Sequence, residues 1–124
     1  MDHLLDPLPY LKSIKKKLKS DGSLLIVTHN EKSLLRYIFK GKWPAFCLQH
    51  PQLYNLKTTS KLLSQAGFEC VDQGRTRNYF KISFLIKHVL WAIGLKIKYI
   101  PDFFGLTLGL KLGNIITIAK QKKD

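Results

Sequence analysis

The hydrophobic and polar pattern is clearest at residues 24–27, an unbroken apolar run with polar residues on both sides. A run this short and continuous is typical of a strand covered on both faces, as in a parallel sheet. His29 and Asn30 would then stand at the carboxyl end of the strand. Open α/β sheets bind their ligands at that end, so these two side chains are candidates for a binding site.

A helix is predicted ahead of this strand. Its apolar residues recur at helical spacing, with lysines on the other faces: Leu8, Leu11, Ile14 and Leu18. Asp6 is a good capping residue, and Pro7 suits the first position of a helix. Because Asp21-Gly22 is a turn dipeptide, we expect this helix to end near Lys19.

A second, shorter helix is predicted after the strand, over residues 31–39, with Asn30 as its cap and Gly41 at its end. Its buried side would consist of four residues: Leu34, Leu35, Ile38 and Phe39. Residues 42–56 then form a loop that holds two prolines.

The next segment predicts a third helix over residues 58–66, stopped by Gly67. Two adjacent leucines would face the core: Leu62 and Leu63. Residues 68–72 alternate between apolar and polar types and predict a strand. A final strand is predicted at residues 115–119, ahead of a basic tail.

Residues 74–113 form a long segment that is rich in both apolar and basic residues. Apolar residues across 80–95 predict one helix, and Pro101 must break the stretch that follows. Three glycines repeat every four residues and favour close packing or a lid loop: Gly105, Gly109 and Gly113. No apolar run approaches the roughly 20 residues of a spanning helix. Insertion at a membrane surface stays an alternative, because aromatics, leucines and lysines are mixed.

The formal net charge of +13 comes from 21 basic and 8 acidic residues. Such a balance favours nucleic acid, an anionic membrane or an acidic partner, although solvated helix faces would also account for it. Cys47 and Cys70 form neither a disulfide framework nor a metal-ligand spacing. Asp2 and Asp6 interrupt any secretory signal. We therefore expect a cytoplasmic location, with peripheral attachment to a membrane as an alternative.

Several motifs together resemble class I S-adenosylmethionine-dependent methyltransferases. Residues 18–30 read Leu-Lys-Ser-Asp-Gly-Ser-Leu-Leu-Ile-Val-Thr-His-Asn, similar to the turn into the fifth strand of that family. Residues 42–46 (Lys-Trp-Pro-Ala-Phe) and residues 58–68, which end in Leu-Leu-Ser-Gln-Ala-Gly-Phe, are also similar. The Asp-His-Leu-Leu-Asp-Pro sequence of residues 2–7 resembles the family's Glu-His-x-x-Asp-Pro, with Asp2 where Glu is usual.

This resemblance implies an α/β fold containing part of a Rossmann-like methyltransferase sheet. Strands five, six and seven would be present with flanking helices, and the strand at the C-terminus would be an antiparallel edge strand. Residues 1–124 would form a single domain, the C-terminal half of the methyltransferase fold. Residues 75–113 would be a helical insertion that covers the substrate pocket and sets specificity.

The cofactor implied by the resemblance is S-adenosylmethionine. The eight glycines form no Gly-x-Gly motif that opens a helix, so the half that carries the cofactor site is expected to be missing. The chain would then be inactive alone. Its expected partners are a polypeptide carrying the N-terminal half or a second copy of itself, with nonspecific nucleic acid and an anionic membrane surface as further candidates.

Six side chains are candidates for the site. His50 is the first choice for a catalytic base, because the family pattern has a His before the third helix and imidazole titrates near neutral pH. A His that only hydrogen-bonds its loop is the alternative. The resemblance places His3 near the cofactor. The remaining candidates are substrate-binding residues: His29, Asn30, Trp43 and Tyr54.

Three functions remain open from the sequence. The first is the substrate-side portion of a methyltransferase that acts on a small-molecule or lipid-like acceptor. The second is a non-catalytic basic module that binds nucleic acid or a partner protein. The third is a peripheral membrane protein that uses residues 80–112. No Ser-His-Asp arrangement, carboxylate pair or metal cluster is evident in the sequence.

Overall fold

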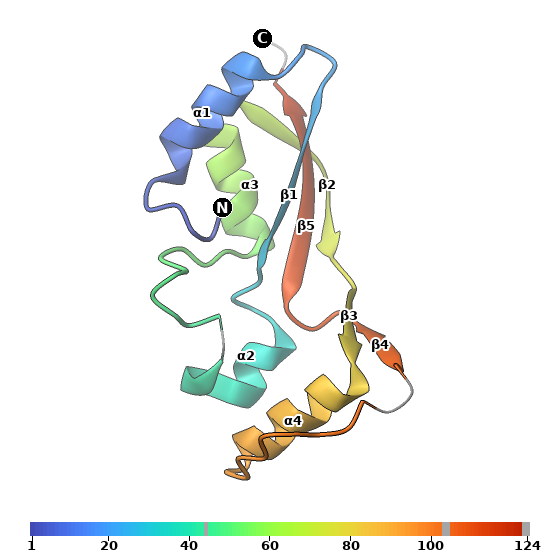
Figure 1. Cartoon of the computed structure of the whole chain (residues 1–124). Coiled ribbons are helices and arrows are strands. Elements are labelled where there is room, and N and C mark those ends of the chain that lie inside the picture. Colours follow the sequence, from blue (N-terminus) through green and yellow to red (C-terminus); the bar gives the residue numbers. More distant parts are fainter. Residues whose placement is uncertain (44, 103–104, 123–124) are drawn as a thin grey trace.

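The computed structural model describes residues 1–43, 45–102 and 105–122. In chain order the elements are α1 (Pro7–Lys17), β1 (Ser23–His29), α2 (Leu34–Phe39), the 3-10 turn η1 (Lys40–Lys42), α3 (Leu56–Gln65), β2 (Phe68–Arg75), β3 (Asn78–Lys81), α4 (Ile82–Ala92), β4 (Thr107–Leu110) and β5 (Asn114–Gln121). Helices α1 and α3 cover one face of a three-stranded sheet, whereas α4, β3 and β4 lie beyond its end (Figure 1). The mixed α/β class predicted from the sequence is confirmed.

Strand β5 is the centre of the sheet, whose order is β1-β5-β2. It pairs antiparallel with both neighbours, so that Leu24 is opposite Ala119 and Phe68 is opposite Gln121. The antiparallel arrangement beside β1 agrees with the resemblance. The prediction that the C-terminal strand is an edge strand is wrong, because β5 is paired on both sides. Among the described residues β1 is paired on one side only, and it is therefore an edge strand.

The prediction that β1 is covered on both faces is wrong. Side chains alternate between the two faces of a strand, and Ile26 and Thr28 point to the face that the helices cover, where both are buried. Leu25 and Val27 point to the opposite face and are 60% and 46% exposed. An apolar run shows that both faces of a strand are apolar, but it does not show that both are covered.

Strand β2 is longer than residues 68–72 and contains an irregularity. Its register against β5 shifts between Cys70 and Asp72, which leaves Val71 in a bulge with 58% of its surface exposed. A bulge of this kind adds one unpaired residue and bends the strand. The alternation of buried and exposed side chains expected for this strand therefore stops at Cys70.

The core lies between the two helices and the sheet. Its buried members are Leu11, Ile26, Leu63, Ala66, Phe68 and Ala119, with Leu62 packed against them. Both leucines of α3 thus face the core, as predicted. Leu63 is completely buried, whereas Leu48 is fully exposed.

Truncating Leu63 tests this core. Leu63→Ala should lower the free energy of unfolding by about 2–5 kcal/mol, because it removes buried methyl groups and leaves a cavity. Chemical denaturation followed by circular dichroism measures the change. Leu48→Ala is the matched control and should shift the free energy by less than about 0.5 kcal/mol. Equal shifts in the two variants would contradict the assignment of Leu63 to the core.

The ends of α1 and α3 follow local capping chemistry. The Asp6 side chain accepts from the backbone N–H of Leu8 at 3.3 Å, and Pro7 is the first residue of α1, as predicted. At α3, Asn55 and Thr58 form a reciprocal capping box. Gly67 follows this helix with φ at +83°, a conformation that favours glycine. Gly67 therefore ends the helix, as predicted.

Helix α2 differs from its prediction. It begins at Leu34, and Ser33 is its cap, because the Ser33 hydroxyl accepts from the Arg36 N–H at 3.3 Å. Asn30 instead accepts from the N–H of Lys32 in the preceding turn, at 3.0 Å. Gly41 does not end the helix, which stops at Phe39 before η1.

The predicted buried side of α2 is also wrong. Leu34 and Ile38 are 55% and 61% exposed, and no residue of this helix is buried. Leu35 and Phe39 are half-buried. Helix α2 lies below α1 and α3, past the end of the layer that they form (Figure 1).

Residues 75–113 are only partly helical. Phe80 belongs to β3, where it is opposite Leu108 of β4, and the helix begins at Ile82. The repeated glycines do not share a helix face, because Gly109 lies in β4. A Cβ at Gly109 would stand 2.8 Å from Cδ of Arg77, so a larger residue here would displace the Arg77 side chain. No helix among the described residues is both long and apolar enough to cross a bilayer.

Candidate functional site

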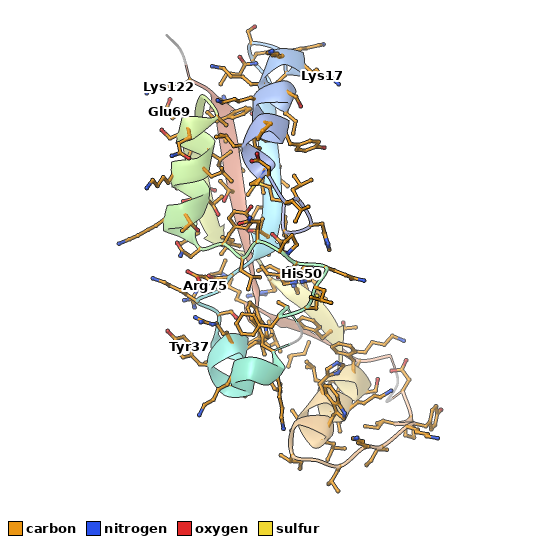
Figure 2. All side chains as sticks on the ribbon, turned by 90° about the vertical axis from the view of Figure 1, so that its left-hand side faces the viewer. Lys17, Tyr37, His50, Glu69, Arg75 and Lys122 are labelled. Atoms are coloured by element: carbon orange, nitrogen blue, oxygen red, sulfur yellow. The ribbon has the colours of Figure 1, made fainter. Side chains whose placement is uncertain are left out.

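Three histidines from separate segments meet at the carboxyl end of β1. His29 ends the strand, and His3 precedes α1. His50, which Figure 2 labels, lies in the loop between α2 and α3. The ring of His50 is between the other two, with centroid separations of 4.6 Å to His3 and 4.6 Å to His29. The sequence nominated each of these side chains separately, and the structure brings them together. We refer to His3, His29 and His50 as the histidine cluster.

A buried carboxylate orients one member of the cluster. Asp2 is 4% exposed, and its Oδ2 accepts from the backbone N–H of His29 at 2.9 Å and from the His29 Nδ1–H at 2.6 Å. Burial alone would raise the pKa of Asp2. The hydrogen bonds from His29, together with attraction to that ring and to the N-terminus, outweigh burial and lower the pKa of Asp2 below 3.8. The carboxylate is therefore ionised at neutral pH.

Asp2 is the residue of the site that sequence reasoning missed. The signal was present, because an acidic residue directly before His3 matches the Glu-His pattern of the resembled family. Its partner could not be read from the sequence, since His29 is 27 residues away.

Carbonyl groups fix the other two rings. Nδ1 of His3 donates to the carbonyl of Gln49 at 2.8 Å, and Nδ1 of His50 donates to the carbonyl of Ala45 at 3.1 Å. Since a carbonyl only accepts, the proton of each neutral ring is on Nδ1. In the neutral form of each ring Nε2 then carries a lone pair, and the same holds for His29, whose Nδ1 faces Asp2. The cluster therefore offers proton acceptors, and among the described residues no group of His, Cys, Asp or Glu is arranged to hold a metal ion.

Trp43 and Tyr54 are buried beside the cluster. Trp43 is 3% exposed and meets the His29 ring edge-on, with centroids 6.4 Å apart. Tyr54 is 4% exposed, and burial together with the negative charge of Asp2 raises the pKa of its phenol to about 12. Tyr54 is thus a protonated donor at neutral pH. Neither its hydroxyl nor Oδ1 of Asp2 has a hydrogen-bond partner within the described chain.

Asn30 has a different position. It is 5% exposed, its side-chain oxygen accepts from Lys32, and its backbone N–H donates to the carbonyl of Gly113 at 2.7 Å. Asn30 also bridges to Tyr54 through a parallel backbone contact. Its side-chain oxygen is used to shape the turn after β1, whereas the hydrogen bonds given for the three imidazoles all involve Nδ1.

Replacing Asp2 tests the link between this carboxylate and folding. Because the pKa of Asp2 is lower in the folded than in the unfolded chain, its stabilisation is complete above the unfolded value of 3.8 and is lost as pH falls through the folded value. Asp2→Asn should cost about 1.5–3 kcal/mol at pH 7, the range for hydrogen bonds to a charged group. The variant should also lose less stability on acidification than the parent. Thermal unfolding of the parent and the variant from neutral to acidic pH measures both effects. If the stability of the two proteins fell in parallel with pH, Asp2 would not contribute through its ionised carboxylate.

The sheet, the helices over one of its faces and the polar cluster at the strand end agree with an α/β methyltransferase domain. A family model described as a methyltransferase domain matches residues 1–73, which is more than half of the chain. The chain therefore belongs to the methyltransferase domain family, in the class I S-adenosylmethionine-dependent group. The match runs from before α1 into β2 and includes every member of the histidine cluster. A comparison with curated proteins gives no match.

Proposed function

We propose that this chain is the substrate-side portion of an S-adenosylmethionine-dependent methyltransferase that acts on a small-molecule or lipid-like acceptor. The observation that carries the proposal is the histidine cluster at the carboxyl end of β1, with His29 held by the buried Asp2. Family membership supports the reaction type. Methyl transfer requires a protein to align donor and acceptor, and an acceptor that reacts through an O–H or N–H group also needs a base to take its proton.

Proton removal is assigned to the cluster. An imidazole whose Nδ1–H is held by a carboxylate keeps Nε2 as a base, and the carboxylate stabilises the charged ring after proton transfer. His29 has such a partner in Asp2, whereas His50 has a carbonyl. His50 is close enough to both neighbours to bind the acceptor or share its proton. Trp43 would form an apolar wall of the site.

The described residues do not form a complete site for S-adenosylmethionine. None of the glycines stands between a strand and the start of a helix, so the glycine-rich loop of such sites has no counterpart here. The orphaned Asp2 Oδ1 and Tyr54 hydroxyl could contact one side of a bound molecule. We propose that a polypeptide with the first half of the fold supplies the main cofactor contacts, with His3 at their border. No step of the reaction is assigned to the cofactor.

Measuring cofactor binding tests whether the main cofactor contacts come from a second polypeptide. The 124-residue chain alone should bind S-adenosylmethionine with a dissociation constant weaker than about 1 mM, a binding free energy below about 4 kcal/mol. Isothermal titration calorimetry measures it. Adding a polypeptide that carries the first half of a methyltransferase domain should restore binding if the two halves assemble. A micromolar dissociation constant for the 124-residue chain alone would overturn the proposal.

A further inference from the structure

Exposed apolar side chains concentrate in one part of the molecule. Of the 22 large hydrophobic side chains exposed in the described chain, eleven lie between residues 79 and 108. Trp91, Ile93 and Tyr99 are among them, at 55%, 67% and 78% exposed. We refer to the described residues of this stretch (79–102 and 105–108) as the apolar lobe. It contains α4 and lies beyond the end of the β1-β5-β2 sheet (Figure 1).

Helix α4 exposes apolar side chains on opposite sides. At 100° per residue, Ile86, Val89 and Ile93 fall on one side, and Phe84 and Trp91 fall on the other. All five are exposed. A helix with this pattern is normally buried in protein or lipid. With 11 residues, α4 is about 16 Å long and cannot cross a hydrocarbon core of about 30 Å.

The segment after α4 folds back along the helix, as Figure 1 shows. Three side-chain contacts hold it there. Asp102 pairs with Lys81 at 2.6 Å and accepts from the Ser83 hydroxyl at 3.4 Å, and Nζ of Lys87 donates to the carbonyl of Lys98 at 3.3 Å. The two strands of the lobe, β3 and β4, pair with each other. The exposed apolar side chains thus belong to a folded unit that is held together by its own hydrogen bonds and ion pair.

Cations are interleaved with these apolar side chains. The ion pairs of the described residues are His29–Asp2 and Lys81–Asp102, so Lys87, Lys96 and Lys98 have no carboxylate within ion-pair distance. A hollow of about 140 Å³ is lined by one of these lysines and mostly apolar surface: Lys87, His88, Trp91 and Ile97. Apolar surface with cations beside it complements the boundary between acyl chains and acidic headgroups.

We propose that the apolar lobe docks on the surface of an anionic lipid bilayer. Trp91 and Tyr99 suit that boundary, because each joins an apolar ring to a polar N–H or O–H. Lysines without a carboxylate partner give the lobe a positive charge that acidic headgroups would neutralise. RNA would neutralise the same lysines but would leave Ile93 and the other apolar side chains in water. The bilayer is therefore the occupant that satisfies both the charge and the apolar surface.

Vesicle binding by the 124-residue chain tests the proposal. The chain should float with vesicles of equal parts phosphatidylcholine and phosphatidylglycerol, and much less with pure phosphatidylcholine. Binding should weaken between about 0.1 M and about 1 M salt, because salt screens the lysines. The fluorescence of the exposed Trp91 should shift to shorter wavelength on binding. Trp43 is already buried, so Trp91→Phe should remove the shift but keep binding.

Charge-reversed variants distinguish the lobe from general attraction to a basic protein. The triple variant Lys87→Glu, Lys96→Glu and Lys98→Glu should weaken vesicle binding by on the order of a hundredfold. The matched control reverses three exposed lysines of α1 and should retain most binding: Lys12, Lys16 and Lys17. Circular dichroism establishes that both variants fold.

An apolar pair of variants completes the test. Trp91→Ser with Tyr99→Ser should also weaken vesicle binding, whereas Tyr37→Ser with Leu48→Ser, at exposed sites outside the lobe, should not. Absence of binding to anionic vesicles, or equal loss in lobe and control variants, would overturn the proposal. Loss of single-stranded RNA binding with vesicle binding unchanged in the lobe lysine variant would assign these lysines to nucleic acid instead.

Discussion

The 124-residue chain is expected to self-associate through β1 or to require a partner that covers this strand. Strand β1 pairs with β5 on one side, and the backbone N–H and C=O groups of its other side have no strand to bind within the described structure. Leu25 and Val27 are exposed beside that edge. Unpaired edges with apolar side chains are templates for association. A second copy or the first half of the methyltransferase fold could occupy this place.

The energy at stake is large for a domain of this size. Full burial of each such side chain is worth roughly 1.5–3 kcal/mol. Leaving several of them in water is comparable to the whole stability of a small domain, about 5–15 kcal/mol. The net charge of +13 favours solubility but does not replace the missing contacts. We therefore expect marginal stability whenever the chain is monomeric.

Light scattering and hydrogen exchange measure this behaviour. The apparent mass should rise with protein concentration. Amides on the unpaired side of β1 should become more protected from hydrogen exchange as the concentration rises. Val27→Lys places a charge beside the free edge and should reduce association, as lysines do on natural edge strands. Val71→Lys, at an exposed position of β2, is the matched control. A monodisperse monomer with strong amide protection on both sides of β1 would show the expectation to be wrong.

The second large effect concerns catalysis in an enzyme assembled from both halves. His50→Ala should lower turnover much more than it lowers stability. Its ring donates one hydrogen bond to a loop carbonyl, so folding loses little when the ring is removed. A general base typically contributes about 10²–10⁴-fold to the rate, and a residue that positions the acceptor contributes through alignment.

His29→Ala should give a different combination of effects. The substitution removes the imidazole that donates a hydrogen bond to the Asp2 carboxylate. The buried carboxylate then lacks one hydrogen-bond donor, which costs about 1–3 kcal/mol of stability. Turnover and melting temperature should therefore fall together. Cys47→Ser, at an exposed side chain 3.3 Å from Nδ1 of His50, is the control and should retain turnover. If His50→Ala left both turnover and melting temperature unchanged, His50 would be a structural residue of its loop.

Local sequence signals predicted the two helices that cover the core, α1 and α3. Helix α1 has a capping Asp6 with Pro7 after it, and α3 ends at a glycine with positive φ, so their boundaries depend on chemistry within a few residues. The boundary predicted for α2 was wrong because two polar residues three positions apart are both suitable helix caps. The structure uses Ser33 for the helix and Asn30 for the turn ahead of it.

Other features depend on contacts between segments far apart in the sequence, and local patterns could not predict them. The apolar residues from Phe80 onward fit a strand and a helix equally well, and pairing with β4 places Phe80 in β3. His3 and His50 were nominated from their positions in family-like motifs, and His29 from its place at the carboxyl end of a predicted strand. Their convergence depends on how the segments before α1, after β1 and after α2 fold together, which no local pattern records. For the same reason the Asp2–His29 pair could not be predicted.

The central position of β5 also determines when the sheet can form during synthesis. Residues of β1 pair with partners roughly 90 positions later, and β2 likewise pairs with β5. Ribosomes add about 5–20 residues per second, so a finished β1 waits about 5–18 s for its partner strand to be made. Helices α1 and α3 depend on local hydrogen bonds and can form during that interval. A nascent chain arrested before residue 114 would therefore be helical but without this sheet, with its apolar strands available to chaperones.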